Sequence, residues 1–263
     1  MIDNKNLLLD VCNTAIRAGD EILKYYIEDI EVTYKDDSSP LTKADLAANK
    51  LIMSSLNQLD VNIPILSEEL IVDWDKRKNW NRYWLVDPLD GTKEFIKKNG
   101  EFTVNIALIE NNKPILGVIF VPAKSKLYFA QKKYGSFKIN TKVVLNTLHT
   151  AKKIFVSKKS NVIRVIGSRS HSNTAFTNWV HEKFPNAKII QAGSSLKFCL
   201  IAEGDADIYP RFGPTSEWDI AAGHIILNEA GGKISTFKNC EINYNMKEDI
   251  LNPEFYAIGS IIL

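Results

Sequence analysis

Apolar positions near the start of the chain recur at helical spacing. The residues that share this face are Leu8, Cys12, Ala15, Ile16, Ile22 and Leu23. Because side chains three and four positions apart lie on one side of an α-helix, the pattern predicts an amphipathic helix over 5–27. The polar run 35–40 interrupts it. A second helix is predicted over 43–59, with Thr42 and Asp45 in a capping arrangement at its start.

Short apolar runs bounded by turn residues follow the second helix. They predict strands over 64–66, 83–87, 102–109, 115–121 and 127–131. The polar, proline-containing segments 111–114 and 122–124 separate the last three of these runs, so they are predicted to be turns. Strands that follow one another through such short turns are typical of an antiparallel meander.

Strands alternate with helices after about residue 150. The pattern predicts strands over 164–167, 188–191, 206–209, 233–236 and 255–258, and helices over 173–184, 195–203 and 216–229. The last helix is expected to end at the pair Gly231-Gly232. We therefore expect an α+β lobe with an antiparallel sheet over 1–150. An α/β lobe with a mixed sheet is expected over 151–263, without a flexible linker between the two.

Composition excludes several classes of protein. The chain has 263 residues, of which 45% are hydrophobic, and its net charge of +2 gives no field that demands nucleic acid. No run approaches the roughly 18 apolar residues of a membrane-spanning helix. The first ten residues lack a basic region before an apolar run, so we expect no signal peptide and a cytoplasmic location. Peripheral membrane attachment and the choice between monomer and homodimer are left open.

The cysteines indicate a reducing environment. Cys12, Cys199 and Cys240 are odd in number, far apart and without CxxC spacing. We expect buried thiols rather than a disulfide or a zinc site.

Acidic residues stand where predicted strands end or helices begin. Asp87 and Asp90 enclose Pro88-Leu89 after one strand, Glu68 follows another strand, and Asp219 opens a helix. Carboxylates that converge at ~4 Å repel one another by several kcal/mol, about 4 per pair at an effective dielectric of 20, so they need protons or cations. Magnesium favours such oxygen ligands. Ordinary roles compete: a turn and helix cap for Asp87 and Asp90, a solvated loop for Glu68 and a first-turn acid for Asp219.

Gly91 and Thr92 follow this motif directly. The Gly91 amide can face a phosphate oxygen, and the Thr92 hydroxyl can orient a water molecule. A threonine hydroxyl is a poor base alone, so a partner must take its proton, and Asp45 is the candidate. The competing role for Asp45 is the capping arrangement noted above.

These motifs together resemble the inositol monophosphatase superfamily of lithium-sensitive, magnesium-dependent phosphatases. The resemblance rests on Asp-Pro-Leu-Asp-Gly-Thr at 87–92, Glu68 upstream and Trp-Asp-Ile-Ala-Ala-Gly at 218–223. The segments 92–96, 99–107, 167–171 and 193–199 are similar to the CysQ-type 3′(2′),5′-bisphosphate nucleotidases within that superfamily. The resemblance covers nearly the whole chain and implies a layered αβαβα sugar-phosphatase-like fold.

The resemblance also implies roles for particular residues. One magnesium ion would be held by Glu68, Asp87 and the Leu89 carbonyl, a second by Asp87, Asp90 and Asp219, and a third, weaker ion would lie near Glu68. Asp45 and Thr92 would activate the attacking water. The substrate would contact Glu68, Leu89, Gly91, Thr92, Ser168, His171, Gly193, Lys197 and Asp219, with Arg211 as a further candidate. Ordinary structural roles stay open for three of these: a helix cap for His171, a turn for Gly193 and a solvated charge for Lys197.

The expected activity is hydrolysis of the 3′-phosphate of adenosine 3′,5′-bisphosphate to AMP and phosphate, with a small nucleotide as the partner. The replacement of the Gly-Thr-Thr-Asn-Phe that is common in inositol monophosphatases by Gly91-Thr92-Lys93-Glu94-Phe95 favours this substrate. Inositol monophosphate and 3′-phosphoadenylyl sulfate are alternative substrates. A non-catalytic nucleotide-binding module is the alternative from another class.

Overall fold

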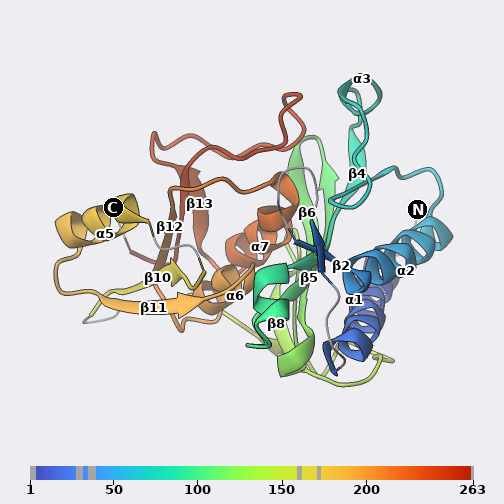
Figure 1. Ribbon diagram of the computed structural model, residues 1–263, viewed down its shortest axis with the longest axis horizontal. Helices are drawn as coiled ribbons and strands as arrows, with labels where there is room; N and C mark the ends of the chain where they lie inside the picture. Colours follow the sequence, from blue (N-terminus) through green and yellow to red (C-terminus); the bar gives the residue numbers. More distant parts are fainter. Residues whose placement is uncertain (1–3, 28–31, 35–39, 159–161, 171–172, 262–263) are drawn as a thin grey trace.

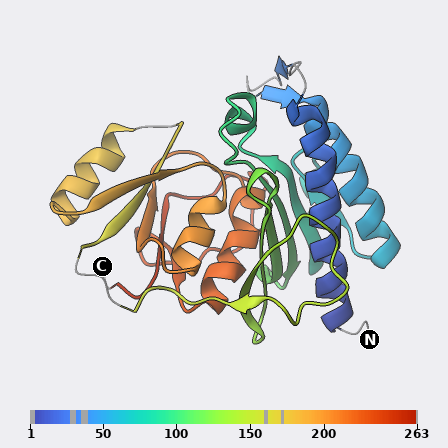
Figure 2. The same cartoon turned by 90° about the horizontal axis from the view of Figure 1, so that it is seen from below.

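Five layers of helix and sheet succeed one another across the molecule (Figures 1 and 2). The computed structural model describes residues 4–27, 32–34, 40–158, 162–170 and 173–261. In order, the layers are α1 (Asn4–Ile27) with α2 (Lys43–Leu59), a seven-stranded sheet, α6 (Leu196–Ala202) with α7 (Glu217–Glu229), a five-stranded sheet, and α5 (Thr174–Lys183). This succession confirms the layered fold that was expected.

The outer helices α1 and α2 cover one face of the seven-stranded sheet (Figure 2). Ile16 and Ile52 from these helices belong to the same buried cluster as Trp84 and Val86 of the sheet. At the start of α2, the Thr42 backbone N–H donates to Asp45 Oδ2 at 2.7 Å, and the Thr42 hydroxyl accepts from Ala44 N at 3.2 Å. The predicted capping arrangement is thereby confirmed.

The seven-stranded sheet has the order β3-β4-β5-β6-β7-β8-β9. Its strands are Ile65–Ser67, Arg82–Asp90, Thr103–Glu110, Lys113–Val121, Lys126–Gln131, Gly135–Asn140 and Lys152–Lys153. β3 and β4 are parallel, and every later pair is antiparallel, which confirms the predicted meander. The two strands β8 and β9 were not predicted, because β8 begins with Gly135-Ser136 and β9 is two exposed lysines.

The five-stranded sheet has the order β11-β10-β12-β14-β13. Its strands, in chain order from β10 to β14, are Arg164–Ser168, Lys188–Ala192, Ile208–Arg211, Lys233–Thr236 and Phe255–Ile258. β10 is parallel to both of its neighbours, whereas β14 is antiparallel to both of its neighbours, so the predicted mixed sheet is confirmed.

One hydrophobic core fills the space between the two sheets. Tyr83 and Leu85 of β4 share a buried cluster with Phe198 of α6, Ile226 of α7 and Phe255 of β14. Alternation along the first part of β4 explains this arrangement, since Tyr83 and Leu85 belong to the core between the sheets, whereas Trp84 and Val86 belong to the cluster beneath α1 and α2. The same core therefore joins both halves of the chain, and the division at residue 150 stays a prediction.

Several short elements were not predicted from the sequence. They are β1 (Val32–Tyr34), β2 (Pro40–Thr42), α3 (Trp74–Arg77) and α4 (Thr92–Ile96), whereas the turn predicted over 122–124 is observed as the 3₁₀ turn η1 (Pro122–Lys124). Each is too short to show a periodic apolar pattern. The predicted polar loop over 35–40 lies outside the described residues, apart from Pro40 in β2.

The expectation of three buried thiols is wrong for one cysteine. Cys12 and Cys199 are buried, as expected, but Cys240 is exposed. Cys240 follows a surface turn after β13, in which its backbone N–H donates to the Thr236 hydroxyl at 3.0 Å. Among the described residues, no helix combines the length and the apolar character needed to cross a membrane.

Candidate active site

A β-bulge in β4 brings Asp87 and Asp90 to the same pocket. Asp87 pairs with Asn105 of β5 and Asp90 pairs with Thr103, so three steps along β4 match two along β5. Two residues separated by three positions in a regular strand would point to opposite faces of the sheet. The additional residue of the bulge cancels this difference. As a result, both aspartates line one pocket of about 270 Å³.

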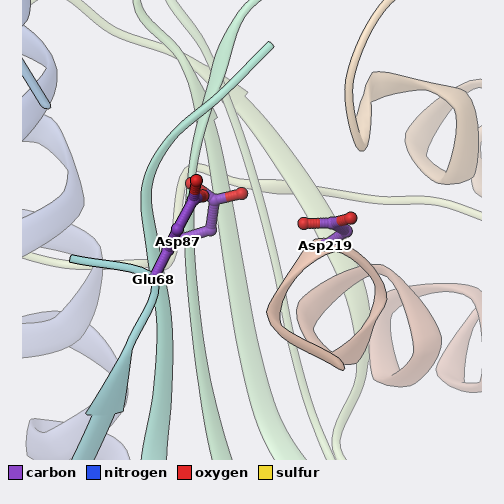
Figure 3. Close-up of side chains that lie close together, drawn as sticks. All are labelled: Glu68, Asp87 and Asp219. Carbon is purple, nitrogen blue, oxygen red and sulfur yellow. The ribbon is translucent and has the colours of Figure 1, made fainter. Parts of the chain in front are cut away.

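Glu68, Asp87 and Asp219 form an acidic cluster in this pocket (Figure 3). One carboxylate oxygen from each residue lies within 4.8 Å of the others. Glu68 directly follows β3, where its backbone N–H donates to Val86 O at 3.1 Å and thereby aligns it with β4. Asp219 comes from the first turn of α7, so three distant segments converge, as the family resemblance implies.

The same local device positions Asp45 and Asp219. Each is the third residue of its helix, and each accepts the backbone N–H of the helix-capping residue. The distances are 2.7 Å from Thr42 N to Asp45 Oδ2 and 2.9 Å from Ser216 N to Asp219 Oδ2. The capping interaction occupies one oxygen of each carboxylate. A capping role and a role in the site are therefore compatible for both residues.

Mutual repulsion and burial raise the pKa values of these acids. Burial, followed by the charges of Glu68, Asp90 and Asp219, raises the pKa of Asp87 well above its ordinary value. Burial, followed by Asp90 and Glu68, does the same to the pKa of Asp219. Burial raises the pKa of Asp90 to about 6, although Lys197 opposes the shift. Taken alone, the cluster is an unfavourable concentration of negative charge.

A chain of buried hydrogen bonds holds Asp90. Its Oδ2 accepts the Ser195 backbone N–H at 2.6 Å and the Asn105 side-chain amide at 3.2 Å. The Ser195 hydroxyl donates to Asn105 Oδ1 at 2.7 Å and lies 2.8 Å from the Thr103 hydroxyl. Because the Ser195 hydroxyl donates its proton to Asn105, the Thr103 hydroxyl is the donor in its contact with the Ser195 hydroxyl. The orientation of Asp90 thus depends on residues from β5 and from the start of α6.

Thr92 lies between Asp45 and the backbone of the bulge. Its hydroxyl is 3.3 Å from Asp45 Oδ1 and 3.3 Å from the Leu89 carbonyl oxygen. Burial raises the pKa of Asp45, against hydrogen bonds from Thr42 that lower it. Gly91 has φ of 88°, a left-handed conformation that favours glycine, and this value turns the chain from β4 into α4. Glu68, Gly91 and Thr92 all line the pocket.

The predicted substrate-contacting residues divide into three groups. Ser168, Lys197 and Arg211 line the pocket. Gly193 does not appear among its lining residues, and its backbone N–H donates instead to Glu101 Oε2 at 2.9 Å. His171 lies outside the described residues. Burial lowers the pKa of Lys197 to about 8, against the opposing charge of Asp90.

Other pocket residues were not found from the sequence. Glu94, Ser194, Ser195 and Tyr209 line the same cavity. Tyr209 lies under Lys197, whose Nζ is 5.3 Å from the centre of the ring. The serines could have been suspected because they follow the predicted contact Gly193. Nothing in the sequence indicated that Tyr209 lines the pocket, because an apolar strand residue is usually part of the core.

The donor set of this site fits a hard divalent cation. The cluster offers carboxylate oxygens, and the Leu89 carbonyl in the same pocket adds a neutral oxygen. Sulfur and imidazole ligands, which would favour softer metals, do not belong to the cluster in the described residues. Burial and the neighbouring carboxylates, which raise the pKa values of Asp87 and Asp219, disfavour their charged forms, and a divalent cation would offset this cost.

Comparisons with known proteins agree with this geometry. The model of the inositol monophosphatase family matches residues 3–258. The 3′(2′),5′-bisphosphate nucleotidase CysQ of Buchnera aphidicola subsp. Acyrthosiphon pisum is 47% identical over 264 residues, which cover 96% of this chain and 94% of that protein. The protein of the same name from Escherichia coli K12 is 44% identical, over 95% of this chain and 98% of that protein.

A solved structure gives the same result. The crystal structure of CysQ from Bacteroides thetaiotaomicron, described as a bacterial member of the inositol monophosphatase family, superimposes with a TM-score of 0.89. It is 38% identical, and the match covers 100% of both chains. The family match and the similar proteins cover nearly the full length of the chain, and the acidic pocket is consistent with them. The chain therefore belongs to the inositol monophosphatase family of metal-dependent phosphatases.

Proposed function

We propose that the chain is a magnesium-dependent phosphomonoesterase that converts adenosine 3′,5′-bisphosphate to AMP and phosphate. The observation that carries this proposal is the convergence of Glu68, Asp87 and Asp219 in a pocket that Lys197 and Arg211 also line. Acidic groups that attract cations and basic groups that attract anions, together in one pocket, suit a substrate with two phosphate groups. The names of the CysQ relatives support the same substrate.

The proposed metal ligands are those that the family resemblance implies. Glu68, Asp87 and the Leu89 carbonyl would hold one magnesium ion, Asp87, Asp90 and Asp219 would hold a second, and a third would bind near Glu68. Bound magnesium polarises the phosphoryl oxygens, lowers the pKa of the attacking water and stabilises the leaving oxygen. The protein contributes positioning and charge, which are its main tasks in phosphoryl transfer.

Asp45 and Thr92 orient the attacking water in this proposal. The Thr92 hydroxyl donates its proton toward Asp45 Oδ1, so its oxygen can accept a hydrogen bond from water. The raised pKa of Asp45 makes its carboxylate a better proton acceptor than an ordinary surface aspartate. The backbone amides of Gly91 and Thr92 hold the phosphate that is transferred.

The remaining residues contact the rest of the substrate. Lys197 and Arg211 neutralise the phosphate that is retained, and Ser168 and His171 contact the nucleoside or its phosphate. In this proposal, residues 1–150 supply most of the metal ligands, whereas residues 151–263 supply Asp219 and the substrate wall. We also propose a cytoplasmic enzyme, in keeping with its free thiols.

A phosphatase panel tests this function. Adenosine 3′,5′-bisphosphate, 3′-phosphoadenylyl sulfate and inositol monophosphate are each assayed with magnesium, without it, and with added lithium. We expect phosphate release that requires magnesium, falls with lithium and is fastest with adenosine 3′,5′-bisphosphate. A clear preference for inositol monophosphate would overturn the choice of substrate. Magnesium-independent release, or none, would overturn the enzyme class.

The variant Asp90→Asn tests the assignment of the site. We expect turnover to fall by about 100- to 1000-fold, the range seen when a group that stabilises transition-state charge is lost. The fold should survive, because asparagine has nearly the same shape as aspartate. Asp75→Asn is the matched control, since Asp75 lies in α3 and its partner Lys78 is also exposed. Wild-type-like turnover in a folded Asp90→Asn protein would contradict the assignment.

A further inference from the structure

Glu101 is a buried carboxylate beside the pocket that has no part in the mechanism above. It lies between α4 and β5, and 9% of its surface is exposed. Its Oε2 accepts Arg169 Nε at 2.7 Å and the Gly193 backbone N–H at 2.9 Å. Its Oε1 accepts Arg169 Nη2 and Lys124 Nζ, both at 3.2 Å. We call Glu101, Lys124, Arg169 and Gly193 the Glu101 clamp.

The clamp joins the metal-binding half of the chain to two segments of the other half. Arg169 follows the end of β10, and Gly193 follows the end of β11. Arg169 also ties these two strand ends together, because its Nη2 donates to Gln191 O at 2.9 Å. In Figure 1, β11 runs towards the centre of the molecule, where α6 begins. The Glu101 carboxylate thus holds the ends of β10 and β11 against the half of the chain that forms the seven-stranded sheet.

The neighbours of the clamped residues line the pocket. Ser168 directly precedes Arg169, and Ser194 directly follows Gly193. A displacement of either clamped residue would therefore move a pocket-lining serine. The carboxylates of the acidic cluster come from the residue after β3, from β4 and from α7, and none of these segments supplies a residue to the clamp.

Close packing around Gly193 makes this junction sensitive to small displacements. A Cβ atom at position 193 would lie 2.6 Å from Glu94 Cγ and 2.9 Å from the Glu101 carbonyl oxygen. Glu94 adds a second link, since its Oε1 accepts the Ser170 hydroxyl at 2.6 Å. The segments 168–170 and 193–195 therefore rest directly on the segment that carries both glutamates.

The electrostatics of Glu101 favour a permanent contact. Burial opposes its ionisation, but Arg169, Lys124 and the Gly193 amide together lower the pKa of Glu101 below its ordinary value. The paired bonds to Arg169 also fix direction, because the guanidinium group and the carboxylate meet in a planar fork. A directional contact of this kind can set the relative position of two surfaces as well as hold them together.

We propose that Glu101 is a positioning residue that aligns the substrate-contacting ends of β10 and β11 over the metal site, and that it governs recognition of the group esterified to the phosphate. This inference rests on the proposed function only where it names that group as a nucleotide. Loss of the clamp weakens binding of the nucleotide and leaves the chemistry at the phosphate in place. A minimal ester such as p-nitrophenyl phosphate is then affected little.

The test compares Glu101→Gln with Glu203→Gln. Glu203 is the matched control, because it is also a shielded glutamate that joins the two halves, through Lys138 and through the Tyr128 hydroxyl at 2.9 Å. It does not line the pocket. The variants are assayed with magnesium on adenosine 3′,5′-bisphosphate, inositol monophosphate and p-nitrophenyl phosphate, and their melting temperatures are measured.

Glu101→Gln is expected to raise KM for the nucleotide by about 10- to 100-fold, as for other groups that orient a site from behind it. Its kcat for the nucleotide and its kcat/KM for p-nitrophenyl phosphate should stay within about threefold of wild type. Glu203→Gln should lower the melting temperature without changing KM. Arg169→Gln removes the same ion pair from its half-exposed side, so it should reproduce the KM effect if Glu101→Gln folds poorly.

Three results would overturn the inference. They are an unchanged KM in both clamp variants, an equal loss on the nucleotide and on p-nitrophenyl phosphate, and the same KM increase in Glu203→Gln. Failure of the proposed function is seen separately, as a wild-type protein that prefers inositol monophosphate. The clamp is then judged by the same comparison between the inositol ester and p-nitrophenyl phosphate.

Discussion

The acidic cluster in the pocket and the Glu101 clamp beside it differ in the charges around their carboxylates. In the acidic cluster, burial and neighbouring carboxylates raise the pKa of Asp87 and of Asp219. In the Glu101 clamp, Arg169 and Lys124 lower the pKa of Glu101 despite its burial. Where the chain supplies its own cations, a carboxylate can hold the structure together. Where carboxylates face one another, the balancing charge has to come from solution.

Asp87→Asn should have the largest effect on the difference between the acidic cluster and the Glu101 clamp. Because Asp87 lies among the other acids, its neutral analogue removes both a predicted metal ligand and a source of repulsion. We expect turnover to fall by about 1000-fold. In metal-free buffer, the free energy of unfolding should rise by on the order of 1 kcal/mol, since a repulsive pair is relieved. Assays with magnesium and denaturant titrations with a chelator measure the two effects.

Asp75→Asn is again the control, here for the predicted loss of turnover and the predicted gain in stability. It changes the same functional group at a site 87% exposed, where ion pairs contribute little. Neither turnover nor stability should change much. A metal-free Asp87→Asn protein less stable than wild type would show that the cluster is not repulsive in the folded state.

Ser195→Ala should have a smaller effect, because it leaves both sets of carboxylates in place. The variant removes the hydroxyl that fixes Asn105 but keeps the backbone N–H that contacts Asp90. We expect kcat to fall by about tenfold, which is typical when a group behind a metal ligand is lost. Steady-state kinetics over a range of magnesium concentrations would show it. Unchanged kcat and unchanged magnesium dependence would exclude a role for this hydrogen-bond chain.

The pH dependence of stability should show the smallest effect and concerns the clamp alone. The folded pKa of Glu101 lies below its ordinary value of 4.5, so its stabilising contribution is present above pH 4.5 and is lost as the pH falls further. The difference in unfolding free energy between wild type and Glu101→Gln should therefore shrink below pH 4.5. Chemical denaturation across this range measures it. A difference that grows in acid would contradict the assigned sign.

The sequence predicted those parts of the fold that have long periodic patterns. The helices expected over 5–27 and 43–59 are observed over Asn4–Ile27 and Lys43–Leu59, because their apolar faces repeat without interruption. The three-residue helical spacing of Thr42 and Asp45 also predicted the cap correctly. The strand β8 was not predicted, because it begins with a glycine and a serine.

The acidic cluster could be anticipated because its members stand at strand ends and beside a recognisable motif. The Glu101 clamp could not. Its contacts join Glu101 to residues 23, 68 and 92 positions away, and a lone glutamate between Gly100 and Phe102 looks like an ordinary turn residue. Only the packing of the two halves of the chain against each other brings Arg169 and Gly193 to Glu101.

The bulge in β4 also has an evolutionary consequence. Its single additional residue sets the facing of Asp90, so the length of the Asp87–Asp90 segment matters as much as its composition. An exchange of Pro88 or Leu89 alters one side chain, whereas a deletion there would leave Asp90 on the same face but remove the bulge, and with it the local backbone that brings Leu89 to the pocket. Descendants of this sequence should therefore accumulate substitutions between the two aspartates but not gaps.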